Sequence, residues 1–459
     1  MRYLNNINTL IIIIFLPLLF WVNLEFHLEF LSFSLLIFFS TYLLTKNDPL
    51  VTQYKNIAHI IYSIFVLIIC SQAIDSGGNL MTEYLVGDSF YYIKESVEFS
   101  KLSFSLNDFR DNSILNYYLY QGLLSIPLKL LSYEHLSACM VSVFISLLCL
   151  ILVGKIASLI NVDPAYKRMC LIIYIIFPHI LATSVSVQKE IILLLLFLLV
   201  IYNSLLVAKQ QGNKFYEFCI ILLCITICFF LRLQFVFVYF VTFFILSTIY
   251  KSNKIFNSSY FIIIIALLII SSLDQFNTLY ELNELNVVDG FNHIQSRLSS
   301  DVYGSGVTNL LAAGYSDFSF FKKIVFLPVV TLVQFLNPIN VWDLSHLSFW
   351  FYLDVNYKIV WLLFIGPLFL FISVKFKILT TELKYILMIS VSGYLLIALT
   401  YSGTLPRYAF IFMALSVFPL SYLLCSLKHS NVLKNQFKLF HLIYLFSGFF
   451  ALILYASLK

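Results

Sequence analysis

A few ionisable side chains interrupt the long apolar runs of this chain, and they are the groups that could do chemistry. They are Asp88, Lys189, Glu190, Arg232 and Arg407. Arginine presents paired N–H donors to phosphate oxygens, and lysine adds a movable point charge. A carboxylate can accept the proton of an attacking hydroxyl group. These residue types predict a site for a phosphate-bearing substrate, with Asp88 and Glu190 as candidate catalytic carboxylates and the three cations as phosphate ligands.

The composition shows what must position these groups. Of the 459 residues, 61% are hydrophobic and only 11% are charged, and the mean hydropathy is +0.93. Soluble domains carry about 25% charged residues. Strand-like alternation is absent, so the sequence predicts an all-α, polytopic integral membrane protein that forms a single membrane domain over residues 1–459. The net charge of +5 is dispersed over short loops rather than gathered on one face, which argues against a nucleic-acid partner.

The hydrophobic runs predict about thirteen transmembrane helices of roughly 20 residues each. The predicted spans are 8–24, 30–44, 57–74, 136–160, 169–187, 190–208, 217–233, 235–250, 259–273, 359–374, 385–401, 408–427 and 440–458. The apolar run 324–337 contains Pro328 and ends at Pro338, so it is predicted to be a re-entrant or interfacial helix rather than a further span.

The short loops that carry lysine and arginine predict the orientation of the spans. Alternate spans place all of these basic clusters on the cytoplasmic side if Arg2 is inside. The clusters are Lys46 with Lys55, Lys155 with Lys167 and Arg168, Lys209 with Lys214, Lys251 with Lys254, Lys375 with Lys377 and Lys384, and Lys428 with Lys434 and Lys438. Two loops of moderate size, about 75–134 and 274–323, then fall outside, as do the candidate site residues. The apolar, tyrosine-rich stretch 114–131 in the first loop is predicted to lie along the membrane surface.

Further residues on the predicted outer side could contact a substrate. They are Tyr91, Tyr92, Gln234 and Arg297. Structural explanations stand beside the functional ones: Lys189 and Glu190 can be a solvated pair, and Asp88 can cap a helix. Arg407 can anchor the topology, and Arg297 can pair with Asp301 on one helix face. Arg232 is hardest to explain by solvation, because it stands in an almost uninterrupted apolar stretch.

The cysteines and histidines predict no metal site and no cofactor. Cys224 and Cys228 are one helical turn apart, but no histidine or carboxylate stands near them in the sequence. Small apolar residues at helix contacts explain the cysteines better.

The layout of these motifs resembles a group of bacterial glycan-assembly enzymes. The aspartate-bearing segment Gly87-Asp88-Ser89-Phe90-Tyr91-Tyr92 is followed by Phe177-Pro178, Gln188-Lys189-Glu190, Leu231-Arg232 and Pro406-Arg407. This order is similar to that of GT-C polyprenyl-phosphate-dependent glycosyltransferases and of Wzy-type O-antigen and capsule repeat-unit polymerases.

The resemblance implies a GT-C-like enzyme of the bacterial inner membrane with its active face in the periplasm. Its substrates would be undecaprenyl-diphosphate-linked oligosaccharides, which it would join into O-antigen or capsular polysaccharide. Membrane lipids, a chain-length regulator and a flippase are the implied partners. Two alternatives stay open: a GT-C transferase that adds a single sugar, and a polysaccharide flippase or transporter. A transporter is expected to show internal repeats and charges near mid-span, and neither is recognised in the sequence.

Overall fold

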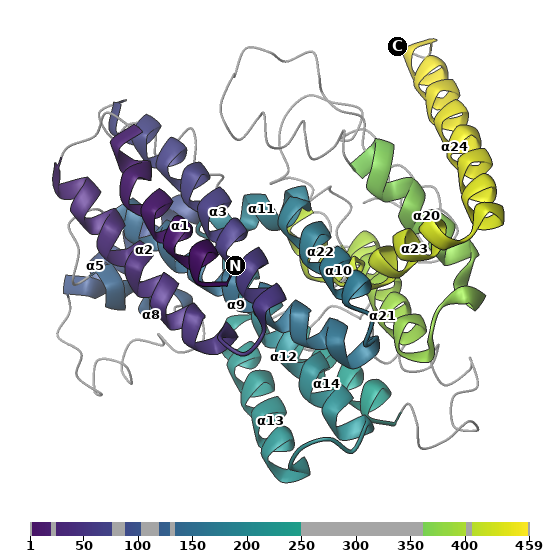
Figure 1. The fold of residues 1–459 in the computed structure, drawn as a ribbon, viewed down its shortest axis with the longest axis horizontal. Helices are drawn as coiled ribbons and strands as arrows, with labels where there is room; N and C mark the ends of the chain where they lie inside the picture. Colours follow the sequence, from purple (N-terminus) through teal and green to yellow (C-terminus); the bar gives the residue numbers. More distant parts are fainter. Residues whose placement is uncertain are drawn as a thin grey trace, which may run out of the picture. The chain divides into compact units, whose positions relative to one another are not determined.

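The computed structural model describes residues 2–19, 24–75, 88–101, 119–128, 134–248, 361–400 and 406–457, and every regular element in these ranges is a helix (Figure 1). The predicted all-helical class is therefore confirmed for the described residues. The chain divides into two compact units: residues up to Val236 form the first, and the described residues from Phe237 onward belong to the second.

The helices of the first unit surround one central helix, α9. The elements are α1 (Arg2–Phe15), η1 (Leu16–Leu19), α2 (Leu24–Thr45), α3 (Pro49–Asp75), α5 (Asp88–Lys101), α8 (Leu119–Leu128), α9 (Glu134–Ile160), α10 (Pro164–Ile176), α11 (Pro178–Val185), α12 (Glu190–Ala208) and α13 (Lys214–Leu231). Helix α14 (Leu233–Thr248) begins in this unit and continues into the second. α9 contacts α2, α3, α5, α8, α10, α11 and α12. Its apolar residues are buried on almost all sides, as expected of a helix inside a bundle.

Helices α3 and α9 run antiparallel along most of their length. A Cβ atom added to Gly154 of α9 would lie 2.6 Å from Cγ2 of Val51, near the start of α3. Further along, Tyr62 of α3 meets Ser146 of α9, and then Cys70 meets Cys139. The glycine lets the two backbones approach closely, which is a common device where apolar helices pack in membranes.

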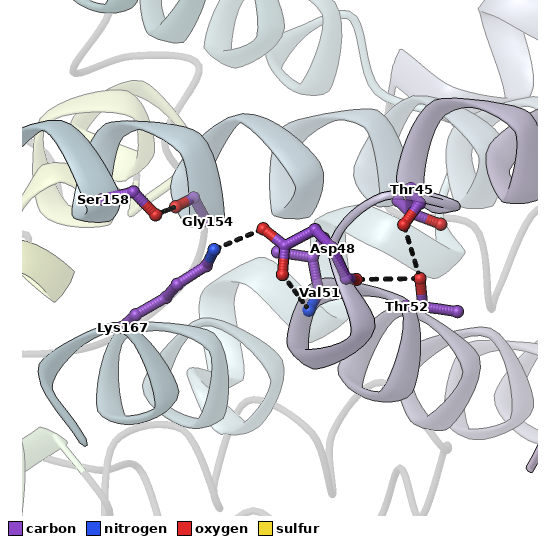
Figure 2. A network of polar contacts seen from close by, with 7 residues as sticks. All are labelled: Thr45, Asp48, Val51, Thr52, Gly154, Ser158 and Lys167. Carbon is purple, nitrogen blue, oxygen red and sulfur yellow. Dashed lines mark hydrogen bonds and ion pairs between the residues drawn. The ribbon is translucent and has the colours of Figure 1, made fainter. Parts of the chain in front are cut away.

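One end of the first unit is held by a polar network that Figure 2 shows. The carboxylate of Asp48, in the turn between α2 and α3, pairs with Nζ of Lys167 of α10 and accepts a hydrogen bond from the backbone N–H of Val51 at 3.2 Å. Thr52 Oγ1 donates to the carbonyl oxygen of Thr45 at 2.7 Å and closes the hairpin between α2 and α3. Asp48 therefore both caps α3 and ties α10 to it.

Several of the predicted basic clusters lie at this same end of the unit. Nζ of Lys209, just after α12, donates to the carbonyl oxygen of Leu159 near the end of α9. Nζ of Lys155 in α9 lies 5.9 Å from the ring centroid of Tyr202, in the second half of α12. The clusters at Lys155, Lys167 and Lys209 thus share one end of the bundle, as the alternating topology requires, whereas the side of the membrane that they face stays a prediction.

The second unit contains α20 (Gly366–Val374), α21 (Thr381–Thr400), α22 (Pro406–Leu415), α23 (Val417–His429) and α24 (Asn431–Ser457), preceded by the π-helical turn η2 (Trp361–Ile365) and interrupted by η3 (Phe376–Ile378). Ser390 Oγ of α21 donates to the carbonyl oxygen of Phe412 of α22 at 2.6 Å. A Cβ atom on Gly393 would lie only 2.0 Å from the Phe412 ring. The ring therefore occupies the space that the glycine leaves open.

Five helices among the described residues are long and apolar enough to cross a membrane: Glu25–Thr45, Pro49–Cys70, Leu136–Ile160, Glu190–Ala208 and Ile411–His429. This indicates a membrane protein. The total of about thirteen spans, the single-domain organisation and the membrane-surface position of stretch 114–131 stay predictions. The predicted span 259–273, the re-entrant segment 324–337 and the loop 274–323 lie outside the described residues.

We expect Gly393→Ala to destabilise the second unit, because the new methyl group must displace the ring of Phe412. Overpacking of this kind costs about 1–3 kcal/mol. Thermal unfolding of the purified protein in detergent should show a lower midpoint than for Ser392→Ala, a change at the neighbouring half-buried position. Equal midpoints for the two variants would show that the Phe412 ring moves aside at no cost.

Candidate functional site

A buried ion pair joins the start of α12 to the junction between α13 and α14. Glu190 is the first residue of α12, and Arg232 is the single residue between α13 and α14. Nη1 of Arg232 donates to Oε1 of Glu190 at 3.2 Å, and the two side chains are 13% and 4% exposed. The structure thus brings together two residues that lie far apart in the sequence.

The local backbone explains why Arg232 can reach this position. Its φ of −167° and ψ of 97° are extended, so the helix stops for one residue. Its N–H donates to the carbonyl oxygen of Cys228 at 2.7 Å, and its own carbonyl oxygen accepts from the N–H of Phe235 at 3.0 Å. These two hydrogen bonds link the end of α13 and the start of α14 to the extended residue between them.

Glu190 is placed by an earlier break in the chain. The predicted span 169–187 is two helices, because Phe177 adopts an extended conformation and Pro178 opens α11. Proline has no N–H and restricts the residue before it, so α10 ends there. Helix α11 is only 8 residues long, and an extended Ser186 leads to Lys189 and the start of α12.

Two aromatic residues and a lysine lie beside the ion pair. The rings of Tyr92 of α5 and Tyr120 of α8 meet edge to face with centroids 5.0 Å apart. Nζ of Lys189 lies 5.8 Å from the Tyr92 ring centroid, within the range of a cation–π contact. Burial raises the pKa of the Tyr120 phenol well above its usual value, and the nearby Tyr92 and Glu190 raise it further. Tyr120 therefore stays a neutral phenol close to Glu190.

Helices α5 and α8 are tied together by a second polar contact. Nε2 of Gln121 in α8 donates to Oε2 of Glu95 in α5 at 3.0 Å. Because Tyr92 and Glu95 are on neighbouring turns of α5, this bond fixes the helix that carries Tyr92. The structure thereby adds Glu95, Tyr120 and Gln121 to the surroundings of the predicted site residues.

Four predicted site residues meet at the start of α12: Tyr92, Lys189, Glu190 and Arg232. Asp88 and Tyr91 belong to the first turn of α5, and Gln234 is the second residue of α14, but their side chains are outside the described residues. Arg407 is the second residue of α22 in the second unit, and its side chain is likewise outside them. Arg297 lies outside the described residues altogether. The roles predicted for all of these residues stay predictions.

The structure also places ionisable residues inside a candidate span. The basic-loop pattern predicts that Lys55 marks a turn, but Lys55 lies within α3 and is fully buried. His59, one helical turn further on, is also fully buried. His59 lies near the middle of the candidate span Pro49–Cys70, where the sequence predicts no ionisable residue, and Lys55 lies nearer its start. The spacing of four residues between apolar flanks is the sequence signal that puts the two on one helix face.

Comparison of the chain with protein-family models, with curated proteins and with solved structures gives no match. The functional reading therefore depends on the residues and their geometry.

We expect substitutions of Glu190 and Arg232 to have strongly non-additive effects on the free energy of unfolding. Removing one partner leaves a buried charge uncompensated, which costs about 3–5 kcal/mol, whereas apolar residues at both positions are often tolerated. Glu190→Leu and Arg232→Met should each lower the free energy of unfolding in detergent by about that amount, and the double variant should lose less than either.

The ion pair of Asp48 and Lys167 provides the control, because its carboxylate side chain is 36% exposed whereas that of Glu190 is 4% exposed. Asp48→Asn keeps an acceptor for the helix cap and should cost at most about 1 kcal/mol, because exposed ion pairs contribute little. If the losses of Glu190→Leu and Arg232→Met simply add in the double variant, the two side chains do not depend on each other.

Proposed function

We propose that this protein is a membrane-embedded glycosyltransferase that joins polyprenyl-diphosphate-linked oligosaccharides into a polysaccharide. The observation that carries the proposal is the guanidinium group of Arg232, which is 13% exposed among apolar helices and is oriented by Glu190. Lys189 precedes Glu190 in the chain. Ionisable groups inside apolar helix bundles are expensive and usually functional. Two cations at one place suit a diphosphate.

The proposed chemistry assigns a role to each group. Arg232 and Lys189 hold the diphosphate of the lipid carrier and stabilise the negative charge that develops when it leaves. Because Glu190 already accepts a hydrogen bond from Arg232, it orients the guanidinium group rather than taking the proton. Asp88, at the start of the helix that carries Tyr92, then takes the proton from the attacking sugar hydroxyl.

The remaining predicted residues complete the proposal. Arg407 keeps the role of phosphate ligand that the sequence predicts, and Tyr91, Tyr92, Gln234 and Arg297 would contact the sugars. The site would face the periplasm from the inner membrane, and a flippase and a chain-length regulator would act with the enzyme. A GT-C transferase that adds a single sugar would use the same cations on the same carrier.

A transporter of lipid-linked glycans is the second candidate, and one observation favours it. Lys55 and His59 are buried inside the candidate span Pro49–Cys70. Transporters carry ionisable residues at such depths, where the residues mark ion or substrate pathways. A glycosyltransferase that works at one membrane face does not need them for its reaction.

Deletion of the gene separates these functions by the glycan that remains. We expect surface glycans capped with a single repeat unit, seen as the loss of the ladder of long chains on a gel. A truncated repeat unit would indicate the single-sugar transferase instead. Accumulation of complete lipid-linked repeats inside the cell would indicate the transporter.

The role of Arg232 is tested by a variant that preserves the ion pair. The charge reversal Glu190→Arg with Arg232→Glu keeps two opposite charges at the site but moves the guanidinium group. We expect normal protein levels in the membrane and a loss of chain elongation of at least about 100-fold, similar to the loss of one transition-state donor. The measurement is the glycan ladder in a deletion strain that carries the variant.

The control for this experiment is Lys46→Met, which removes an exposed cation at the other end of the first unit. It should leave the ladder unchanged. Wild-type chain lengths in the charge-reversed variant would assign the ion pair to stability alone and would remove the main support for the proposed site.

A further inference from the structure

Helix α3 carries a polar stripe that faces the interior of the first unit. Lys55, His59 and Ser63 are spaced four residues apart and therefore lie on one face of the helix. All three have no exposed surface. They lie inside the candidate membrane span Pro49–Cys70.

The polar atoms of this stripe lack hydrogen-bond partners in the part of the chain that the structure describes. These atoms are Nζ of Lys55, Nδ1 and Nε2 of His59 and Oγ of Ser63. Buried polar groups are nearly always hydrogen-bonded, so a group of this size without partners indicates an occupant. The ammonium group of Lys55 lies over the Phe38 ring, whose centroid is 4.5 Å away.

Helix α2 carries one more buried hydroxyl group, and the register of the α2–α3 hairpin sets its level. The α2–α3 hairpin is closed where Thr52 bonds to Thr45, and further along Lys55 meets Phe38. Continuing this antiparallel register by one turn places Ser34 at the level of His59. Oγ of Ser34 is also buried without a partner among the described residues.

The charge of the stripe points to an anionic occupant. Lys55 lies close enough to His59 to act on it electrostatically. Asp48, the carboxylate in the adjoining turn, is committed to Lys167 and to the α3 cap. An ammonium group that is buried without an opposite charge is strongly unfavourable, so a negatively charged ligand would remove the cost.

We propose that Lys55, His59, Ser34 and Ser63 form a binding site for a phosphate oxyanion, supplied either by free phosphate or by the headgroup of an anionic lipid. Lysine offers three donors, while histidine and serine can each donate one, so the four side chains match a group with several acceptor oxygens. Lys55 would supply the positive charge, and the other three side chains would donate directional hydrogen bonds to the oxygens. This site is separate from the Glu190–Arg232 pair and does not depend on the proposed function.

The experiment measures ligand-dependent stability of the full-length protein in a neutral detergent without phosphate. Its probes are inorganic phosphate, micelles containing dioleoyl phosphatidylglycerol, and micelles containing dioleoyl phosphatidylcholine as the zwitterionic reference with no net charge. A ligand that binds only the folded state raises the unfolding temperature, and we expect a rise of at least about 2 °C with one of the anionic probes. A rise with phosphate alone identifies the free ion, whereas a rise restricted to phosphatidylglycerol identifies the lipid headgroup.

Lys55→Met is the decisive variant, with Lys46→Met as its control. Removing the uncompensated charge should leave the unfolding temperature in ligand-free buffer unchanged or higher, and should abolish the rise with the anionic probe. Lys46→Met should keep the rise. His59→Leu and Ser34→Ala, which leave Lys55 in place, should each reduce the rise and provide the test if Lys55→Met does not accumulate. The proposal is overturned if no anionic probe stabilises the wild type, or if the rise is the same in all of these variants.

Discussion

The interior of the first unit must compensate every charge that it buries, because apolar helices offer no water to do so. Glu190 and Arg232 meet this requirement with each other. Asp48 and Lys167 meet it nearer the surface, at one end of the bundle. Lys55 has a ring beneath it but no opposite charge among the described residues, and this contrast distinguishes it from the other buried cations. The paired charges can be explained by the stability of the bundle, whereas Lys55, unpaired within the described ranges, indicates a ligand.

The geometry of the candidate site depends on where two helices end, at Phe177 and at Arg232. A continuous helix through Arg232 would direct its side chain according to the helical repeat alone, whereas one extended residue frees it to meet Glu190. The break at Phe177-Pro178 does the same for the start of α12. Straight spans supply the packing around α9, and the interruptions supply the geometry of the polar groups.

The sequence predicts the helical class and the approximate positions of the long apolar helices, because hydrophobicity and length are local properties. It does not predict the start of α3 at Pro49, since a lysine at position 55 is typical of a loop between spans. It also missed the break at Phe177, because the apolar run continues through the proline. Tertiary contacts were further out of reach. Glu190 and Arg232 are 42 positions apart, and no spacing rule connects residues at that separation. The sequence indicates their proximity only in that both residues lie in loops predicted on the same side of the membrane.

The linked helices α10, α11 and α12 have a consequence for biogenesis. Both ends of this segment are anchored at one end of the first unit, by Lys167 on Asp48 and by Lys209 on the end of α9. Neither α10 nor the eight-residue α11 is long enough alone to cross a bilayer of about 30 Å. If this end faces the cytoplasm, as the basic loops predict, the segment would enter the membrane as one looped hairpin with its flanking lysines on the cytoplasmic side. Glu190 would then enter the bilayer as part of this hairpin, ahead of the α13–α14 junction that carries Arg232.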